Sequence, residues 1–121
     1  MAKILVAEDE ASVREFVTRA LTHAGHDVVT VVDGLRALDA LSGGSYDLLV
    51  TDIVMPEMDG ITLALKVTKD WPDMAVLLMT GYAAERQRAH NLEALIHRVI
   101  AKPFSLAEFL AAVDEALARE R

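Results

Sequence analysis

The chain has 121 residues, a length that suits one domain, and 53% of them are hydrophobic, which is enough to form a buried core. Its 19 acidic residues outnumber its 12 basic residues, and the formal charge of -7 disfavours nonspecific binding to nucleic acids. The absence of cysteine excludes disulfides, zinc–thiolate sites and cysteine nucleophiles.

Four short, continuous apolar runs lie at residues 4–7, 48–50, 75–79 and 99–101, and residues 28–32 form a fifth that is apolar except for Thr30. Such runs are typical of strands in a parallel sheet that is covered on both faces. Stretches with helical spacing separate them, so the sequence predicts a single α/β domain with a (βα)5 alternation. Because right-handed crossovers leave few topologies, we expect the doubly wound, flavodoxin-like strand order 2-1-3-4-5.

Turn and capping signals mark the first three predicted helices. The first has an apolar stripe at helical spacing within residues 13–24 and ends at Gly25. An Asp-Gly pair at residues 33–34 opens the second helix. Another Asp-Gly pair at 59–60 precedes the third, which we expect to run to about residue 71.

The last two predicted helices differ in how clearly the sequence marks them. Residues 83–95 are helical by composition, although their apolar stripe is weak. In the final helix Ser105 and Glu108 fit a capping box. Phe104 precedes that cap and Phe109 lies at the fourth helical position, so these two side chains are expected to form a hydrophobic staple.

The start of the chain gives no sign of export. Acidic residues appear at Glu8, Asp9 and Glu10, too early for a signal peptide, and no apolar stretch approaches the ~20 residues of a membrane span. We therefore expect a soluble, cytoplasmic protein.

Four of the predicted strands end on polar side chains, at Glu8-Asp9, Asp52, Thr80 and Lys102. The carboxyl ends of parallel strands share one rim, and Asp9 and Asp52 end the two strands that flank the switch point where ligands bind. Neighbouring carboxylates repel by roughly 4 kcal/mol per pair at about 4 Å and an effective dielectric constant of about 20, so a cation must offset them. Mg²⁺ prefers such oxygen ligands together with phosphate oxygens. The rim therefore predicts a magnesium and phosphoryl site, with Lys102 as a second source of positive charge.

This ordered set of rim residues, together with Lys102-Pro103, residues 52–56 and Asp59-Gly60, resembles the CheY-like receiver domain of two-component response regulators. The resemblance covers residues 1–121 and leaves no room for an attached effector domain. It implies a stand-alone phosphoacceptor that is not an enzyme, apart from catalysing its own phosphoryl transfer and dephosphorylation.

The resemblance also implies a role for each rim residue. Asp52 accepts a phosphoryl group from a sensor histidine kinase or histidine phosphotransferase, and Thr80 and Lys102 contact that group. The implied cofactor is Mg²⁺, held by the following groups: Glu8, Asp9, Asp52 and the backbone carbonyl of Val54. The Lys102-Pro103 peptide is expected to be cis, and phosphorylation is expected to shift a two-state equilibrium.

In the same family a surface near the end of the chain changes on phosphorylation. Here it is expected from Ala84 to Arg98 and on the last helix, where residues 85–98 carry a local excess of basic over acidic residues. We predict that a downstream protein or a second copy of the chain docks there, with Arg86 and Arg88 involved. Neither DNA nor a membrane is an expected partner.

One position departs from the family pattern. Val99 stands three residues before Lys102, where many receivers carry a Tyr or Phe whose rotamer reports phosphorylation. We hypothesise that Tyr82, two residues after Thr80, supplies an aromatic gate instead.

Other classes share parts of this pattern. A haloacid dehalogenase-type enzyme needs a second acid where this chain has Val54, and a flavodoxin-like flavin carrier needs a phosphate loop that Glu8, Asp9 and Glu10 would repel. The remaining alternative is a receiver-like interaction module that works without phosphorylation. The start of the chain and residues 52–60 also resemble CpdR-type single-domain regulators, which direct proteolysis through a protease partner.

Overall fold

The computed structural model describes residues 2–81, 87–88 and 99–119 of the chain. Its strands and helices alternate as predicted, in the order β1 (Lys3–Ala7), α1 (Ala11–His23), β2 (Asp27–Val31), α2 (Gly34–Ser42), β3 (Leu48–Asp52), α3 (Gly60–Asp70), β4 (Ala75–Thr80), β5 (Val99–Ala101) and α5 (Leu106–Arg119). The helix predicted over 83–95 lies outside the described residues, except for Gln87 and Arg88. None of the helices in the described ranges is long and apolar enough to cross a bilayer.

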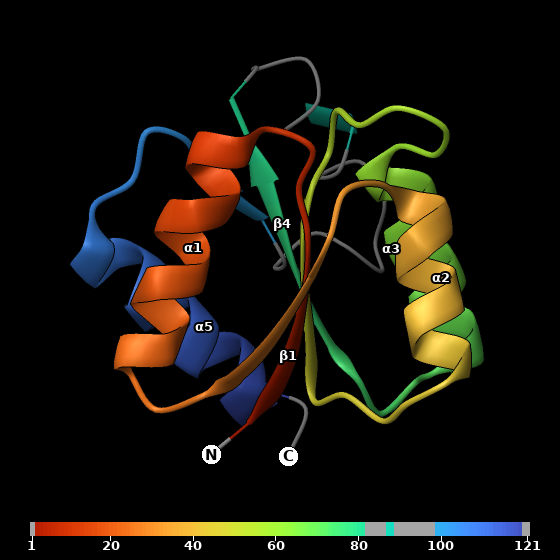
Figure 1. Cartoon of the computed structure of the whole chain (residues 1–121), viewed down its shortest axis with the longest axis horizontal. Coiled ribbons are helices and arrows are strands. Elements are labelled where there is room, and N and C mark those ends of the chain that lie inside the picture. Colours follow the sequence, from red (N-terminus) through yellow and green to blue (C-terminus); the bar gives the residue numbers. More distant parts are fainter. Residues whose placement is uncertain (1, 82–86, 89–98, 120–121) are drawn as a thin grey trace.

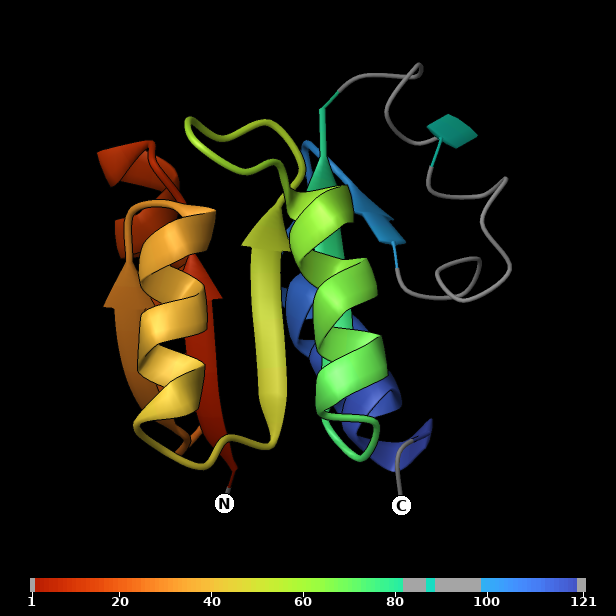
Figure 2. The same ribbon diagram turned by 90° about the vertical axis from the view of Figure 1, so that its right-hand side faces the viewer.

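The five strands form one parallel sheet in the order β2-β1-β3-β4-β5, which confirms the predicted topology. Helices α1 and α5 cover one face of this sheet, and α2 and α3 cover the other (Figure 1). Figure 2 shows α2 and α3 side by side in front of the strands. The apolar core accordingly has two parts, one around Leu63 of α3 and one around Val17 of α1 and Phe109 of α5.

Side chains at the helix ends make the predicted caps. Asp33 accepts a hydrogen bond from the Arg36 N–H at 2.8 Å, and Asp59 accepts one from the Thr62 N–H at 2.8 Å. Gly25, just after α1, has a φ of 93°, a left-handed conformation that costs glycine little. These caps fix where α2 and α3 begin and where the chain turns back from α1.

The capping box at the start of α5 forms as predicted. The Ser105 N–H donates to Glu108 Oε1 at 2.8 Å, and the Glu108 N–H donates to Ser105 Oγ at 3.1 Å. The Phe104 and Phe109 rings stack with their centroids 5.2 Å apart, which confirms the staple. Together these contacts attach α5 to the chain that leaves β5 at the rim of the sheet.

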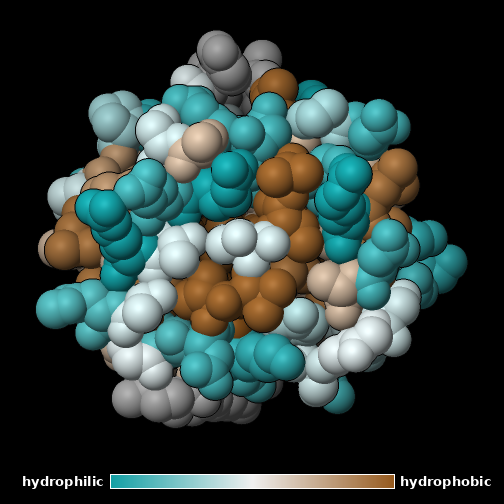
Figure 3. Space-filling model, in the orientation of Figure 1, coloured by the Kyte–Doolittle hydropathy of each residue, from teal (hydrophilic) through white to brown (hydrophobic). Residues whose placement is uncertain are grey.

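The central strands β1, β3 and β4 are buried on both faces, as predicted, but β2 is not. All six residues of β4 are buried, whereas Val29 of β2 is 36% exposed and Val32, just beyond it, is 40% exposed. Figure 3 views this side of the molecule and shows apolar surface near its middle, where Figure 1 draws β2 in front of β1. Because β2 is an edge strand in the described sheet, it is packed less closely than the central strands.

Candidate functional site

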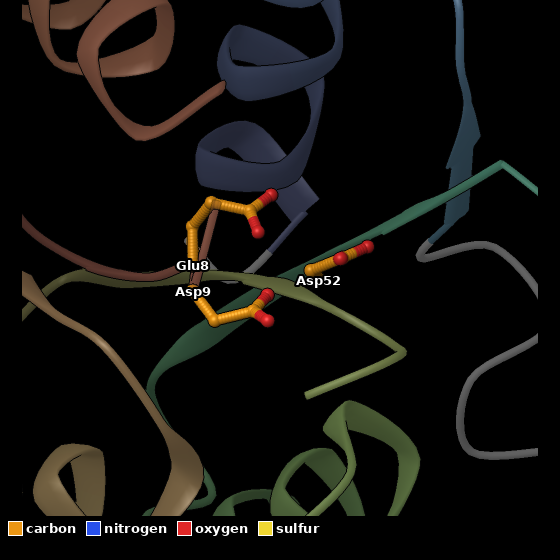
Figure 4. Close-up of side chains that lie close together, drawn as sticks. All are labelled: Glu8, Asp9 and Asp52. Atoms are coloured by element: carbon orange, nitrogen blue, oxygen red, sulfur yellow. The ribbon is translucent and has the colours of Figure 1, made fainter. Parts of the chain in front are cut away.

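Three carboxylates meet at the carboxyl ends of β1 and β3. Glu8 and Asp9 follow β1, and Asp52 is the last residue of β3. Since β1 and β3 pair in register up to Ala7 and Thr51, their ends lie next to each other. One oxygen atom of each of the three carboxylates lies within 4.8 Å of the others. Figure 4 shows the Glu8 and Asp9 side chains extending from the end of β1 toward Asp52.

Glu8 is the buried member of this cluster, with no exposed surface. Its Oε2 accepts a hydrogen bond from the Glu10 N–H at 3.2 Å, and its Oε1 lies 3.4 Å from the Lys102 ammonium. Burial raises the pKa of Glu8 to about 7, and the nearby charge of Asp52 adds to the effect. An ionised Glu8 therefore needs positive charge close by.

Asp52 and Lys102 form the second contact across the cluster. Lys102 Nζ lies 3.3 Å from Asp52 Oδ1, which also accepts a hydrogen bond from the Ile53 N–H at 3.0 Å. Burial raises the pKa of Asp52, although the Lys102 charge opposes that shift. Burial acts to lower the pKa of Lys102, but the charges of Asp52 and Glu8 outweigh it and raise that pKa. Lys102 is thus a firmly charged ammonium ion between two carboxylates.

The cluster suits a small divalent cation. Lys102 pairs with two of the three carboxylates, so the ionised cluster carries an excess of negative charge. Its donors are hard oxygen atoms, which Mg²⁺ prefers, and the pairing of β1 with β3 brings them together. The residues therefore fit Mg²⁺, which when bound would neutralise charge on phosphoryl oxygens.

A cavity of about 540 Å³ opens beside the carboxylates. Its lining includes the following residues: Asp9, Glu10, Asp52, Ile53, Val54, Thr80, Gly81 and Lys102. Thr80 is buried at the end of β4, and its carbonyl oxygen accepts a hydrogen bond from the Lys102 N–H at 2.7 Å. Five of the six predicted site residues therefore line this cavity, and the sixth, Glu8, lies buried in the carboxylate cluster beside it. The Lys102-Pro103 peptide is cis, as predicted.

Sequence reasoning missed two residues that support this cavity. Arg14, on α1, donates from Nη1 to the backbone carbonyl oxygens of Glu8 at 2.8 Å and of Asp9 at 3.4 Å. Gly60 was recognised only as a helix start, yet its N–H donates to the Ile53 carbonyl at 2.7 Å and its Cα packs against the backbone of Asp52. No local spacing signals either contact, and the Asp-Gly pair at 59–60 indicated only the start of a helix.

The predicted docking surface is described only in part. Tyr82, Arg86 and the remaining residues from Ala84 to Arg98 lie outside the described residues, apart from Gln87 and Arg88. Arg88 Nη2 lies 3.3 Å from Asp59 Oδ2, at the start of α3. Asp59 is partly desolvated, but its hydrogen bonds from Thr62 and Arg88 outweigh that effect and lower its pKa. Arg88 thus has an acidic partner within the chain.

The known proteins that this chain resembles include response regulators and their receiver domains. Residues 4–114 match the family profile described as response regulator receiver domain. The response regulator receiver protein CpdR of Brucella abortus (strain 2308) is 38% identical over 97% of this chain and 98% of its own length. The transcriptional regulatory protein TcrA of Mycobacterium tuberculosis is 37% identical over 90% of this chain, which spans only 43% of TcrA. The crystal structure of the response regulator protein TrrA from Thermotoga maritima, in complex with Mg(2+)-BeF, superposes with a TM-score of 0.86 at 30% identity, covering 96% of this chain and 99% of TrrA.

Proposed function

The chain belongs to the response regulator receiver domain family of two-component signalling, and on that premise we propose that it is a stand-alone switch phosphorylated on Asp52. The phosphoryl group would come from a sensor histidine kinase or a histidine phosphotransferase. The observation that carries this proposal is the convergence of Glu8, Asp9 and Asp52 beside Lys102 at one rim of the sheet.

In the proposed reaction, an oxygen of the Asp52 carboxylate attacks the phosphorus atom of a phosphohistidine. A new O–P bond forms while the N–P bond breaks, and the departing imidazole nitrogen keeps the electron pair. Lys102, already 3.3 Å from Asp52 Oδ1, is placed to neutralise the transferred oxygens. The domain catalyses only this transfer and its later hydrolysis, so it is not an enzyme acting on a separate substrate.

The magnesium ligands proposed are Glu8, Asp9, Asp52 and the backbone carbonyl of Val54. The first three offer carboxylate oxygens within 4.8 Å of one another, and Val54 lines the same cavity. With the ion bound, the charges of the three carboxylates are balanced by Mg²⁺ and Lys102. Phosphorylation adds about one further negative charge, because the acyl phosphate on Asp52 carries nearly two where the free carboxylate carried one. That surplus would draw in the Thr80 hydroxyl.

The proposed output is a change in a protein-binding surface. Thr80 ends β4 in the cavity wall, directly before the segment from Ala84 to Arg98 that we predict as the docking surface together with α5. Movement of Thr80 toward the phosphoryl group would bias that segment toward one of two arrangements. A downstream protein, or a second copy of the chain, would then bind the favoured arrangement.

An apolar groove next to the cavity is the proposed contact for the phosphate donor. The groove is lined by Ser12, Val13, Phe16, Pro103, Phe104 and Lys102, so Lys102 borders both spaces. Phe16 is 42% exposed, and Leu106 beyond the groove is 46% exposed. A donor helix packed here would bring its phosphohistidine within reach of Asp52.

The alternative function is a receiver-like interaction module that binds its partner without phosphorylation. The two functions separate in one experiment, in which the protein is incubated with acetyl phosphate and MgCl₂ and its intact mass is measured. We expect a gain of one phosphoryl group that is lost in Asp52→Asn and in the presence of EDTA. Asp39→Asn, at an exposed position of α2, is the matched control and should still be labelled. A wild-type protein that gains no mass would favour the interaction module.

A further inference from the structure

We infer that Arg14 is a positioning residue for the magnesium site, because its side chain fixes the backbone that carries Glu8 and Asp9. The inference rests on the proposed function, since it concerns the same metal ion. Arg14 lies in the first turns of α1 and is half-buried. Its side chain contacts the backbone carbonyls of Glu8 and Asp9, and as a cation it supports the ligands and is not itself a ligand.

A single residue holds three consecutive carbonyl groups of the turn between β1 and α1. Arg14 Nη1 donates to the Glu8 carbonyl oxygen at 2.8 Å and to the Asp9 carbonyl oxygen at 3.4 Å. The backbone N–H of Arg14 donates to the Glu10 carbonyl oxygen at 3.0 Å as the first turn of α1 forms. The 2.8 Å contact is the strong one, and the 3.4 Å contact is at the outer limit for such bonds.

These carbonyl contacts bear directly on the direction of the metal ligands. A peptide unit is planar, so fixing the Glu8 carbonyl also fixes the N–H of Asp9 and limits how the Asp9 side chain leaves the backbone. On the strand side, the Glu8 N–H donates to the Val31 carbonyl at 3.1 Å. The Glu8 residue is therefore held at both its N–H and its carbonyl. Rotation of this turn would move two of the three carboxylates at once.

The charge of Arg14 makes the inference open to a clear test. A guanidinium ion on the backbone of two metal ligands repels Mg²⁺, so a purely electrostatic role predicts that removing Arg14 strengthens metal binding. A positioning role predicts the opposite, because an ordered turn offers its carboxylates with less reorganisation. Residues that orient metal ligands typically change metal affinity by about 10–100-fold when they are replaced. The sign of the effect thus separates the two roles.

Three variants carry the experiment. Arg14→Met keeps the length of the side chain but removes both the charge and the donors. Arg14→Lys keeps the charge but replaces the forked guanidinium by a single ammonium. Arg19→Met is the matched control, because Arg19 lies on the same helix but is exposed and pairs with Glu15 at 2.7 Å. Each variant is titrated with Mg²⁺ by isothermal titration calorimetry, and its melting temperature is measured in EDTA.

We expect Arg14→Met to weaken Mg²⁺ binding about tenfold and Arg14→Lys to lie between it and the wild type. Arg19→Met should bind Mg²⁺ as the wild type does, or slightly more tightly. In the absence of metal, the amide NMR signals of Asp9 and Glu10 should shift in Arg14→Met and not in Arg19→Met. If Arg14→Met does not fold, as its melting curve will show, Arg14→Lys alone decides the question.

The inference is overturned if Arg14→Met, or Arg14→Lys where the first variant does not fold, binds Mg²⁺ as tightly as the wild type or more tightly. Its failure is distinct from failure of the proposed function. If the wild type binds Mg²⁺ and is labelled by acetyl phosphate, and the Arg14 variants bind Mg²⁺ equally well, only the role of Arg14 is overturned. If the wild type binds no Mg²⁺, both the proposed function and the role of Arg14 are overturned.

Discussion

The backbone carbonyl of Asp52 occupies the space that a Cβ atom on Gly60 would need. Such a Cβ would also lie 2.9 Å from the Ile53 Cα atom, inside van der Waals contact. The start of α3 can therefore press against the end of β3 only because residue 60 has no side chain. This contact supports the backbone of the proposed phosphoacceptor, whose side chain Lys102 contacts.

Gly60→Ala should accordingly push α3 away from the end of β3. We expect a loss of stability of about 1–3 kcal/mol, as found for overpacked interiors, and weaker Mg²⁺ binding because Asp52 and Val54 move with the backbone. Gly43→Ala is the control, since the nearest atom to its Cβ would be 3.7 Å away. Urea denaturation of both variants checks the prediction, and equal stability of the two would contradict it.

The stability of the metal-free protein should fall with rising pH because of Glu8, and bound Mg²⁺ should oppose that fall. Burial, the Asp52 charge and Asp9 raise its pKa to about 7, against an ordinary value of 4.5, while Lys102 and the Glu10 N–H oppose the shift. The folded chain then binds a proton that the unfolded chain releases. This stabilisation is complete below about pH 4.5 and is lost as the pH rises through about 7.

In EDTA, the melting temperature of the wild type should therefore fall between about pH 4.5 and about pH 7 and level off above that. Because Mg²⁺ binds the ionised carboxylate, the rise in melting temperature caused by MgCl₂ should grow over the same range. Glu8→Gln should flatten both curves. Differential scanning fluorimetry over this range provides the measurement, and a magnesium effect that does not change with pH would count against the assignment.

Phe16→Ala should slow phosphorylation by the cognate kinase without affecting phosphorylation by acetyl phosphate. The exposed ring lies in the groove beside Lys102, and truncating an aromatic residue that acts as an interface hot spot costs about 2 kcal/mol or more of binding. The small phosphate donor does not need this groove. The two rates are compared with radiolabelled kinase and with intact mass, using Leu65→Ala on α3 as the exposed apolar control. Parallel loss of both reactions would instead indicate damage to the site.

Ser105→Ala should lower stability by about 1 kcal/mol, because the first turn of α5 loses one half of its capping box. The Glu108 carboxylate would still accept the N–H of residue 105, so the helix should form. We expect the Mg²⁺ affinity to stay unchanged, since neither Ser105 nor Glu108 lines the cavity. Urea denaturation and magnesium titration of one preparation test both statements.

The strand order and the rim could be predicted from the sequence because two local signals coincide there. Each central strand is a continuous apolar run, and each run ends on a polar residue such as Asp52 or Thr80. Parallel pairing then requires those residues to share one end of the sheet. The exposure of Val29 in β2 does not follow from its residue type, although Thr30 makes this run the one that is not continuously apolar.

The contacts of Arg14 and Gly60 could not be predicted because they depend on the paths of loops. An arginine has many rotamers of similar energy, so its sequence position does not say that it turns back to the Glu8 carbonyl. The approach of Gly60 to Asp52 depends on the turn between β3 and α3, in which Glu57 has a φ of 71°. The Tyr82 gate and the surface from Ala84 to Arg98 stay predictions.

Lys102 and Glu8 are 94 residues apart in the chain although their charges lie 3.4 Å apart. During synthesis on the ribosome, the amino-terminal strands emerge well before the lysine that compensates their acids. A nascent chain that stops before β5 thus holds mutually repelling carboxylates with no ammonium between them, and long-range contacts of this kind form late and slowly in folding. Pairing of β5 with β4 is what brings Lys102 to Glu8 and Asp52, so the charge balance of the site depends on the strand that is synthesised last.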